Sequence, residues 1–356
     1  MVNALFAFVT ALAVAFGATP VVRILAKNVG AIDVPKDNRR MHKTPIPRMG
    51  GLAIFFGFVV AVLLFFNMTI QMKSILMGAV VLVVLGVVDD IKPLPALFKL
   101  VVQIGAALIP VSQGVKVYSV AHPFISYDYI RLGMWSVPLT VIWIVGMINA
   151  VNFIDGLDGL AVGISSIASV SMLVVAALVS EGYVVIIMAA LAGACIGFMP
   201  FNINPAKIFM GDTGSMFLGY ILAVMSVQGL FKFYAIVTFA VPFVVLGLPI
   251  VDTVFAIIRR LLKGQSPFTA DRGHVHHRLV DLGFDQKQTV AILYALSAVL
   301  GLSAVVLTSS GEAKILILVL AVALAVFFGI SVFAYDVKKE KQQKEQEKKD
   351  EDNKEN

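Results

Sequence analysis

Acidic residues lie next to long apolar runs of the sequence, where they could hold a cation or a phosphate. The first pair, Asp89 and Asp90, comes near the end of such a run in the segment VVLGVVDDIKP. A carboxylate at this position is costly unless it faces a cavity, a cation or a partner. Two adjacent carboxylates also repel each other, which favours a bound cation. Taken alone, the pair fits a functional site and a simple helix-end charge equally well.

A second polar cluster lies in the segment NAVNFIDGLDGL. Its carboxamide and carboxylate side chains recur every three residues, at Asn149, Asn152, Asp155 and Asp158. In a helix this spacing would form a steep polar stripe. The glycines after Asp155 suggest that the helix opens there, so that backbone N–H groups and Asx side chains could hold a ligand. This density of polar groups favours function over the alternative, an Asx-rich turn.

The segment NPAKIFMGDTGS precedes another apolar run. Asp212 or Thr213 could cap the helix that follows, which is the structural alternative. The same position would offer a carboxylate to a metal ion and a helix N-terminus to an anion. Lys207 adds a cation that suits a phosphate group.

Three of the five histidines lie close together in the segment HVHHRL, at His274, His276 and His277, and Arg278 follows them. A structural zinc site is disfavoured, because no cysteine is near and adjacent histidines point apart on a regular backbone. We favour a cationic, hydrogen-bonding clamp for phosphate or sugar. A plain surface loop is the alternative.

The segment DNRRMHKTPIPRMGG contributes Lys43 and Arg48. Its prolines and its Gly-Gly pair suggest a backbone held in one shape, which fits a substrate contact. The alternative is positive charge that contacts lipid headgroups.

The elements that position these residues follow from composition. The chain has 356 residues, of which 59% are hydrophobic and 14% charged, whereas soluble domains carry about 25% charged residues. A spanning helix needs about 20 apolar residues. The sequence therefore predicts an all-α integral membrane protein with about eleven spans, at 2–26, 49–69, 73–90, 97–113, 134–152, 160–180, 183–200, 214–231, 234–258, 289–308 and 314–335.

Charge sets the expected orientation. Most of the 28 Lys and Arg residues fall on one side of the membrane if the N-terminus is outside and the C-terminus is cytoplasmic, as the positive-inside rule requires. All the polar clusters then face the cytoplasm. We expect a membrane domain at 1–335 and a charged, disordered cytoplasmic tail at 336–356. No segment offers the soluble basic face that nucleic-acid binding would need.

The combined inventory suits a pyrophosphate substrate. Carboxylates bind a hard divalent cation such as Mg²⁺, which takes one or two of them together with water and phosphate oxygens. Lys and Arg bind phosphates, and amides and histidines bind a sugar or base. The sequence has no P-loop motif, which disfavours an ATPase of the P-loop class.

The chain resembles the polyprenyl-phosphate N-acetylhexosamine-1-phosphate transferase family through five motifs in order: DNRRMHKTPIPRMGG, VVDDIKP, NAVNFIDGLDGL, NPAKIFMGDTGS and HVHHRL. The resemblance implies a plasma-membrane enzyme that uses Mg²⁺, for which Mn²⁺ can substitute. It would transfer a phospho-sugar from a UDP-sugar to undecaprenyl phosphate within the bilayer and release UMP. A homodimer is compatible with this expectation.

The resemblance also implies roles for single residues. Asp212 matches the main metal ligand, and Asn152 is a second candidate. Asp89 and Asp90 match paired acids that position or deprotonate the acceptor phosphate, and Lys99 matches a phosphate-binding lysine.

Further expected members of the site are also assigned by the resemblance. Asp158 matches a uracil-contacting position, the segment 274–278 matches the clamp, and Asp155 is expected to be catalytic. Additional substrate contacts are expected from Lys43, Arg48, Asn149 and Lys207.

HVHHRL is similar to the WecA/TagO branch of the family, which makes UDP-GlcNAc the expected donor. A role in starting a teichoic acid linkage unit, or another cell-envelope polymer, would follow. One alternative is a transferase of the MraY type, which uses a muropeptide nucleotide. A secondary transporter is a second alternative, although its ionisable residues would be expected near the middle of the membrane.

Overall fold

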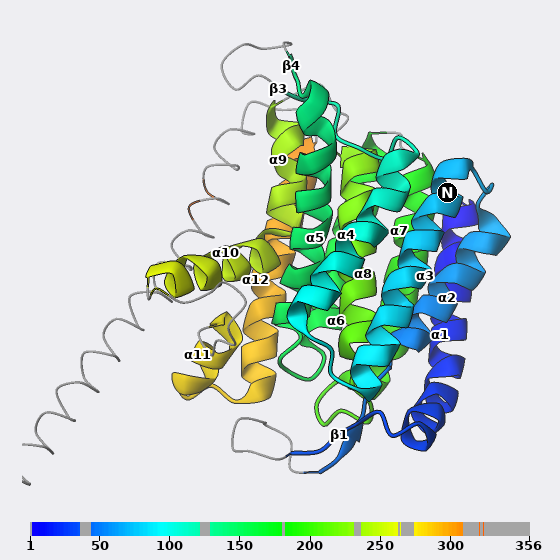
Figure 1. The fold of residues 1–356 in the computed structure, drawn as a ribbon, viewed down its shortest axis with the longest axis vertical. Coiled ribbons are helices and arrows are strands. Elements are labelled where there is room, and N and C mark those ends of the chain that lie inside the picture. Colours follow the sequence, from blue (N-terminus) through cyan, green and yellow to red (C-terminus); the bar gives the residue numbers. More distant parts are fainter. Residues whose placement is uncertain are drawn as a thin grey trace, which may run out of the picture.

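The computed structural model describes residues 2–35, 44–121, 129–179, 182–230, 236–262 and 274–308, together with 264, 320 and 323. In these parts of the chain, helices form one bundle, with a short two-stranded ribbon at each end (Figure 1). Strand β1 (Ile32–Asp33) pairs antiparallel with β2 (Ile46–Pro47) at one end. Strand β3 (Ser119–Ala121) pairs antiparallel with β4 (Tyr129–Arg131) at the other.

The helices follow the predicted apolar runs. Their bounds are α1 Val2–Asn28, α2 Gly51–Phe65, α3 Ile70–Ile91, α4 Ala96–Ser112, α5 Ser136–Ile154, α6 Leu160–Leu178, α7 Gly182–Asn202, α8 Gly211–Met225, α9 Ile236–Val245, α10 Gly247–Leu262, α11 Val275–Asp281 and α12 Gln286–Thr308. A 3₁₀ turn (Gly133–Trp135) precedes α5, and a π-helical turn (Ser226–Leu230) follows α8. Within the described ranges, six helices are long and apolar enough to cross a membrane.

These helices support an all-α membrane protein. The count of eleven spans and the orientation stay predictions. The predicted span 314–335 and the predicted tail 336–356 lie outside the described residues, apart from positions 320 and 323.

The predicted span 234–258 is not one helix. Helix α9 ends at Val245 and α10 begins at Gly247, where the chain turns sharply and α10 points away from the bundle (Figure 1). The break lies just before Pro249, whose ring disfavours a continuous helix through the preceding turn. Helix α10 also buries Arg259 and Arg260 on one side, so it could not face lipid all round.

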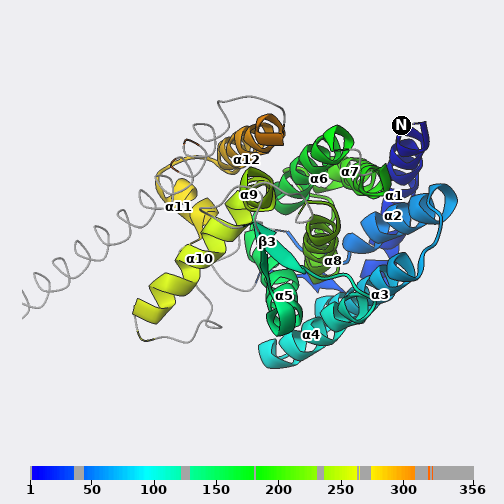
Figure 2. The same cartoon turned by 90° about the horizontal axis from the view of Figure 1, so that it is seen from above.

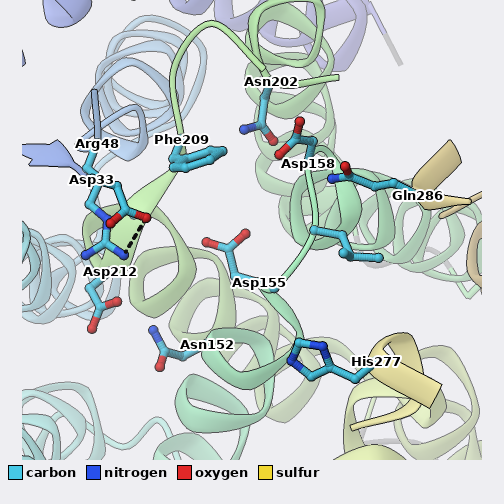
Figure 3. Close-up of a pocket in the computed structure, with 13 residues that line it drawn as sticks. Asp33, Arg48, Asn152, Asp155, Asp158, Asn202, Phe209, Asp212, His277 and Gln286 are labelled. Atoms are coloured by element: carbon cyan, nitrogen blue, oxygen red, sulfur yellow. Dashed lines mark ion pairs between the residues drawn. The ribbon is translucent and has the colours of Figure 1, made fainter. Parts of the chain in front are cut away.

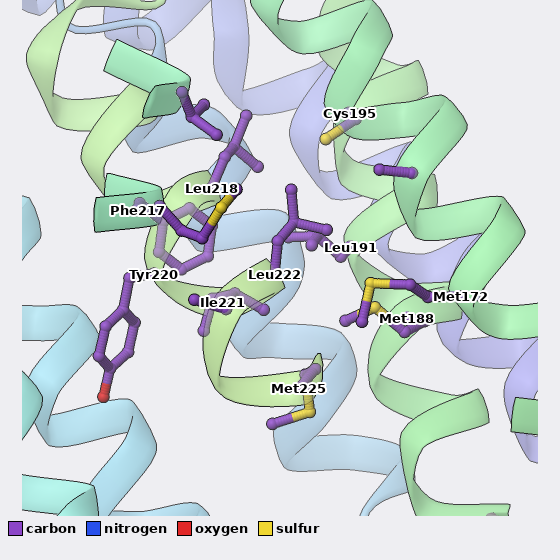
Figure 4. Close-up of a cluster of buried hydrophobic side chains, with 14 of the residues drawn as sticks. Met172, Met188, Leu191, Cys195, Phe217, Leu218, Tyr220, Ile221, Leu222 and Met225 are labelled. Carbon is purple, nitrogen blue, oxygen red and sulfur yellow. The ribbon is translucent and has the colours of Figure 1, made fainter. Parts of the chain in front are cut away.

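Helix α8 runs through the middle of the bundle, with α2, α3, α5 and α6 around it (Figure 2). Its apolar residues are fully covered: Phe217 contacts the rings of Phe55 and Phe58 in α2, and Leu222 lies beside Leu191 of α7 (Figure 4). At the start of α8 the contact is backbone to backbone. A Cβ added at Gly86 of α3 would lie 2.4 Å from the Thr213 Cα. Glycine therefore lets the end of α3 reach the beginning of α8.

Candidate active site

A lysine lies between two carboxylates at the end of the bundle that carries β1 and β2. The Nζ of Lys99, in the first turn of α4, is 3.1 Å from Asp89 Oδ2 and 3.0 Å from Asp212 Oδ2. Asp89 Oδ1 also accepts a hydrogen bond of 2.7 Å from the Leu94 N–H, which fixes the turn between α3 and α4. The structure thus brings together three predicted site residues that are far apart in the sequence.

Asp90 has a different environment from its neighbour. Its Oδ1 accepts from the Asp212 N–H at 2.9 Å, and its Oδ2 accepts from the Thr213 N–H at 3.2 Å and the Thr213 hydroxyl at 2.6 Å. These are orphan donors of the first turn of α8, whose dipole favours an anion there. Asp90 is 6% exposed. It therefore anchors the end of α3 to the start of α8.

Gly211 makes this anchor fit. Its φ is +73°, in the left-handed region, and an added Cβ would lie 2.4 Å from Asp90 Oδ2. Any other residue would be strained in this conformation and would also displace the carboxylate. Because Asp212 follows directly, the Asp90 contact also sets the direction in which the Asp212 side chain points.

A polar cavity of about 210 Å³ opens beside this cluster (Figure 3). Its ionisable and amide side chains include Asp33, Arg48, Asn152, Asp155, Asp158, Asn202, Asp212, His277 and Gln286. One water needs about 10–15 Å³ by the same measure, so the cavity can hold a hydrated cation together with phosphate oxygens. Four carboxylates face one arginine and one histidine in this lining, which makes it acidic.

Asp155 lies at the C-terminal cap of α5, where the helix opens as the glycines predicted. Burial raises the pKa of Asp155 to about 8, and the nearby Asp212 carboxylate raises it further, whereas Arg48 opposes the rise. In Figure 3 the Asp155 carboxylate points into the cavity. The cavity therefore favours either a proton or a cation beside this group.

Asn152 and Asn149 separate along α5. Asn152 lines the cavity, and its Nδ2 donates to Ser215 Oγ at 2.8 Å. Its carbonyl oxygen accepts no hydrogen bond within the described residues. Asn149 lies one turn deeper and donates to Gln103 Oε1 and to the Val145 carbonyl, both at 2.8 Å. Asn149 is therefore held within the bundle and does not line the cavity.

Asp158 lines the cavity and also shapes its rim. Its Oδ2 accepts from Asn204 Nδ2 and from the Ala206 N–H, each at 3.0 Å. Asn202 supports the same region by accepting from the Gly159 N–H at 3.1 Å and donating to the Ile208 carbonyl at 3.0 Å. These contacts join the turn after α5 to the loop before α8.

The histidine segment reaches the cavity from α11. His274 Nδ1 is 2.7 Å from Asp252 Oδ2, and Asp252 Oδ1 accepts from the Val275 N–H at 2.8 Å. His277 lines the cavity, and its ring centroid is 4.3 Å from that of His276. Arg278 is 2% exposed, so it is enclosed by the protein.

His276 lies behind His277 and against the turn after α5. It is 2% exposed, and neither ring nitrogen has a hydrogen-bond partner in the described parts of the chain. Burial lowers the pKa of His276 to about 3, which keeps the ring neutral. A Cβ added at Gly156 would lie 2.2 Å from His276 Nε2. Gly156 therefore leaves the space that this ring occupies.

Sequence reasoning missed several residues of this site. Asp33 pairs with Arg48 across the β1–β2 ribbon, with 3.6 Å between Asp33 Oδ2 and Arg48 Nη2. Phe209 and Gln286 also line the cavity. Asp252 was itself a candidate from the sequence, because it is an acid within an apolar run; only its pairing with His274 was missed.

Several predicted substrate contacts lie outside the cavity lining, namely Lys99, Asn149, Lys207, His274, His276 and Arg278. Lys207 is exposed in the loop before α8 and lies outside the lining. Lys43 lies outside the described residues.

The residues present fit a divalent cation that is completed by substrate. Within the described residues, no three His, Cys, Asp or Glu side chains form a ready-made metal cluster. Mg²⁺ needs only one or two protein carboxylates, since water and phosphate oxygens fill its other positions. Asp212, Asp155 and the carbonyl oxygen of Asn152 offer suitable donors on one cavity wall. The acidic lining would otherwise repel a diphosphate.

The chain is similar in sequence to known proteins. The family model described as glycosyl transferase family 4 matches residues 72–230. A "probable undecaprenyl-phosphate N-acetylglucosaminyl 1-phosphate transferase" of Bacillus subtilis is 41% identical, covering 87% of this chain and 86% of the relative. A "decaprenyl-phosphate N-acetylglucosaminephosphotransferase" of Mycobacterium tuberculosis is 35% identical, covering 80% of this chain and 78% of the relative. An "undecaprenyl-phosphate alpha-N-acetylglucosaminyl 1-phosphate transferase" of Yersinia pestis is 27% identical, covering 90% of this chain and 87% of the relative.

The matched region contains the α3 end, Lys99, the turn after α5 and the start of α8. The relatives also extend over most of this chain. The chain belongs to glycosyl transferase family 4.

Proposed function

We propose that the protein transfers N-acetylglucosamine-1-phosphate from UDP-GlcNAc to undecaprenyl phosphate, giving undecaprenyl-pyrophosphoryl-GlcNAc and UMP. The names of three similar proteins support this transferase reaction. The reaction would take place at the cytoplasmic face of the plasma membrane. Its product would start a teichoic acid linkage unit or another cell-envelope polymer.

The observation that carries the proposal is the position of Lys99. Its ammonium group bridges Asp89 and Asp212, and Asp212 also lines the acidic cavity. A lysine beside the cavity suits the acceptor phosphate, whereas the cavity suits the pyrophosphate of a nucleotide sugar. Asp212 lies between these two places, where both phosphates need their charge neutralised.

Mg²⁺, for which Mn²⁺ can substitute, supplies that neutralisation when bound, with Asp212 and Asn152 as its ligands. Asp155 contributes a further carboxylate at the cavity wall. Arg48 and His277 contact the donor from the opposite side. Asp158 keeps the nucleotide-binding turn in place through the Asn204 and Ala206 contacts.

The transfer would be a direct in-line displacement. An oxygen of the lipid phosphate attacks the β-phosphorus of UDP-GlcNAc, a new P–O bond forms, and the bond to the bridging oxygen of UMP breaks. Lys99 and Asp89 orient the acceptor and stabilise its attacking form. A covalent route through Asp90 is disfavoured, because both of its oxygens are occupied by donors from the start of α8.

A donor panel tests the specificity. Purified protein in nanodiscs would receive UDP-GlcNAc, UDP-GalNAc or UDP-MurNAc-pentapeptide, each with and without undecaprenyl phosphate, and released UMP would be measured. We expect acceptor-dependent UMP from UDP-GlcNAc. Release only from the muropeptide nucleotide would overturn the donor assignment, and the absence of UMP release from every donor would contradict a transferase.

A further inference from the structure

A second cavity lies at the opposite end of the bundle from the active site. Its volume is about 380 Å³, and it is lined by Lys116, Tyr118, Ser119, Arg131, Gly133 and Ser136. These residues belong to the segment just before β3, to the β3–β4 ribbon, and to the 3₁₀ turn and the first residue of α5. Figure 1 shows the ribbon at the end away from β1. The cavity is therefore separate from the proposed transferase site.

Two basic side chains line the cavity, and none of the described residues in its lining is acidic. Within the described residues, neither Lys116 nor Arg131 forms an ion pair with a carboxylate. Lys116 Nζ instead lies 5.2 Å from the centre of the Tyr118 ring, in a cation–π contact. Basic residues are disfavoured on the outer side of a membrane protein. Two of them in one cavity on the predicted outer side therefore favour an anionic ligand.

The scaffold of this cavity is tied to the bundle. Ser136 Oγ donates to the Val117 carbonyl, and the Val117 N–H donates to Thr140 Oγ1 at 3.0 Å. The Leu132 N–H donates to the Tyr118 carbonyl at 3.0 Å. These contacts hold the segment that contains Lys116 against the start of α5, so the two cations are presented from a defined backbone.

The surroundings of the cavity have the composition of a membrane interface. Trp135 is 63% exposed, Tyr118 57% and Met134 84%. Exposed Trp and Tyr side chains concentrate at the level of lipid headgroups. An apolar side chain as exposed as Met134 is stable there only against acyl chains. The cations thus lie where a phospholipid places its phosphate.

We propose that this cavity binds the phosphodiester headgroup of an anionic phospholipid of the outer leaflet. Lys116 and Arg131 bind the phosphate, the Ser119 side of the ribbon contacts the polar headgroup, and the acyl chains lie along Met134 and Trp135. Such a lipid would fix the β3–β4 ribbon at the membrane surface.

Tryptophan fluorescence can test the proposal, because the chain has two tryptophans. In a Trp143→Phe background, Trp135 is the only emitter. The protein would be placed in nanodiscs that contain phosphatidylglycerol and phosphatidylcholine at one fixed ratio, with bromine on the acyl chains of either lipid. Each basic residue near the surface favours an anionic lipid by a factor of about five, so two of them predict a preference of about 25-fold. Brominated phosphatidylglycerol should therefore quench Trp135 far more than expected if the two lipids contacted it in proportion to their amounts in the bilayer.

The double variant Lys116→Gln/Arg131→Gln should lose this preference. The control Lys73→Gln, an exposed lysine in the first turn of α3 at the same end, should keep it. Quenching in proportion to lipid composition, or an unchanged preference in the double variant, would overturn the proposal. Relief of quenching by added inorganic phosphate would overturn the lipid assignment in favour of a free anion.

A second measurement needs no tryptophan substitution. Phosphatidylglycerol should raise the melting temperature of the detergent-solubilised parent more than phosphatidylcholine does, and this difference should vanish in the double variant but not in Lys73→Gln. An equal effect of the two lipids on the parent would contradict the proposal.

Discussion

Substitution of Asp90 tests whether this residue anchors α8 or takes part in chemistry. Asp90→Asn keeps the side-chain volume but removes the charge and replaces one acceptor oxygen with an NH₂ group. If the amide oxygen stays with Thr213, the new NH₂ group faces the Asp212 N–H, which is then left without an acceptor. The start of α8 then has an unsatisfied buried donor.

The magnitude follows from these hydrogen bonds. An unsatisfied buried donor costs about 1–3 kcal/mol. Removal of an anion from a helix N-terminus adds about 0.3–1 kcal/mol, or about 2 kcal/mol in a buried setting. We therefore expect Asp90→Asn to lower the free energy of unfolding by about 2–4 kcal/mol and to lower activity, because Asp212 shifts.

Asp89→Asn is the matched comparison. Its amide oxygen can still accept from the Leu94 N–H, whereas its ion pair with the Lys99 ammonium group is removed. This variant should lose activity while keeping most of its stability. Thermal or denaturant unfolding followed by tryptophan fluorescence, together with UMP release, would separate the two positions.

The coupling between Asp90 and Thr213 gives a further check. Thr213→Val removes the hydroxyl donor, and a double-mutant cycle with Asp90→Asn should give a coupling of about 0.5–3 kcal/mol. An Asp90→Asn protein as stable as the parent, with no coupling to Thr213 and no activity, would refute the anchoring role. Asp90 would then belong to the chemistry.

Three other substitutions have defined outcomes. Asp212→Asn should abolish UMP release and Mg²⁺ dependence while the protein still enters the membrane, as checked by membrane fractionation; full turnover would exclude the metal assignment. Gly156→Ala should displace His276, lower the free energy of unfolding by about 1–3 kcal/mol and reduce activity. The control Gly146→Ala should be tolerated, because the new Cβ in α5 would have open space around it. Equal behaviour of the two variants would argue against the close packing of Gly156 on His276. Burial lowers the pKa of His276 from 6.5 to about 3, so between these pH values the unfolded chain binds one more proton than the folded protein, and the free energy of unfolding falls as pH drops. His276→Gln should flatten this pH dependence in unfolding measurements. An unchanged slope would contradict the neutral ring.

Much of the fold follows from patterns that act locally along the chain. Apolar runs of membrane-spanning length placed the helices, and the glycines after Asp155 marked the point where α5 opens. The break between α9 and α10 was missed, although Pro249 and the two arginines of α10 were visible signals. The apolar content of 234–258 masked them, because a single hydropathy window averages over a short break.

The structure brings several predicted residues together, but the contacts that each one makes were not predictable from the sequence. Asp89 and Asp90 are neighbours in the sequence, yet successive residues on a helix point in different directions. Which one meets Lys99 and which one meets α8 depends on the rotation of α3 against its neighbours. The Asp33–Arg48 pair depends on the short ribbon β1–β2, whose two-residue strands carry no usable alternation. Lys207 had the right charge, but its loop leaves it exposed.

The most direct test of the proposed reaction follows the β-phosphorus of the donor. UDP-GlcNAc labelled with ³²P at the β-phosphate would be incubated with the protein, Mg²⁺ and undecaprenyl phosphate, and the lipid and aqueous phases would be separated. Phospho-sugar transfer predicts that the label enters the lipid phase in the same molar amount as UMP appears in water. Label that leaves as UDP while only the sugar reaches the lipid would contradict the account.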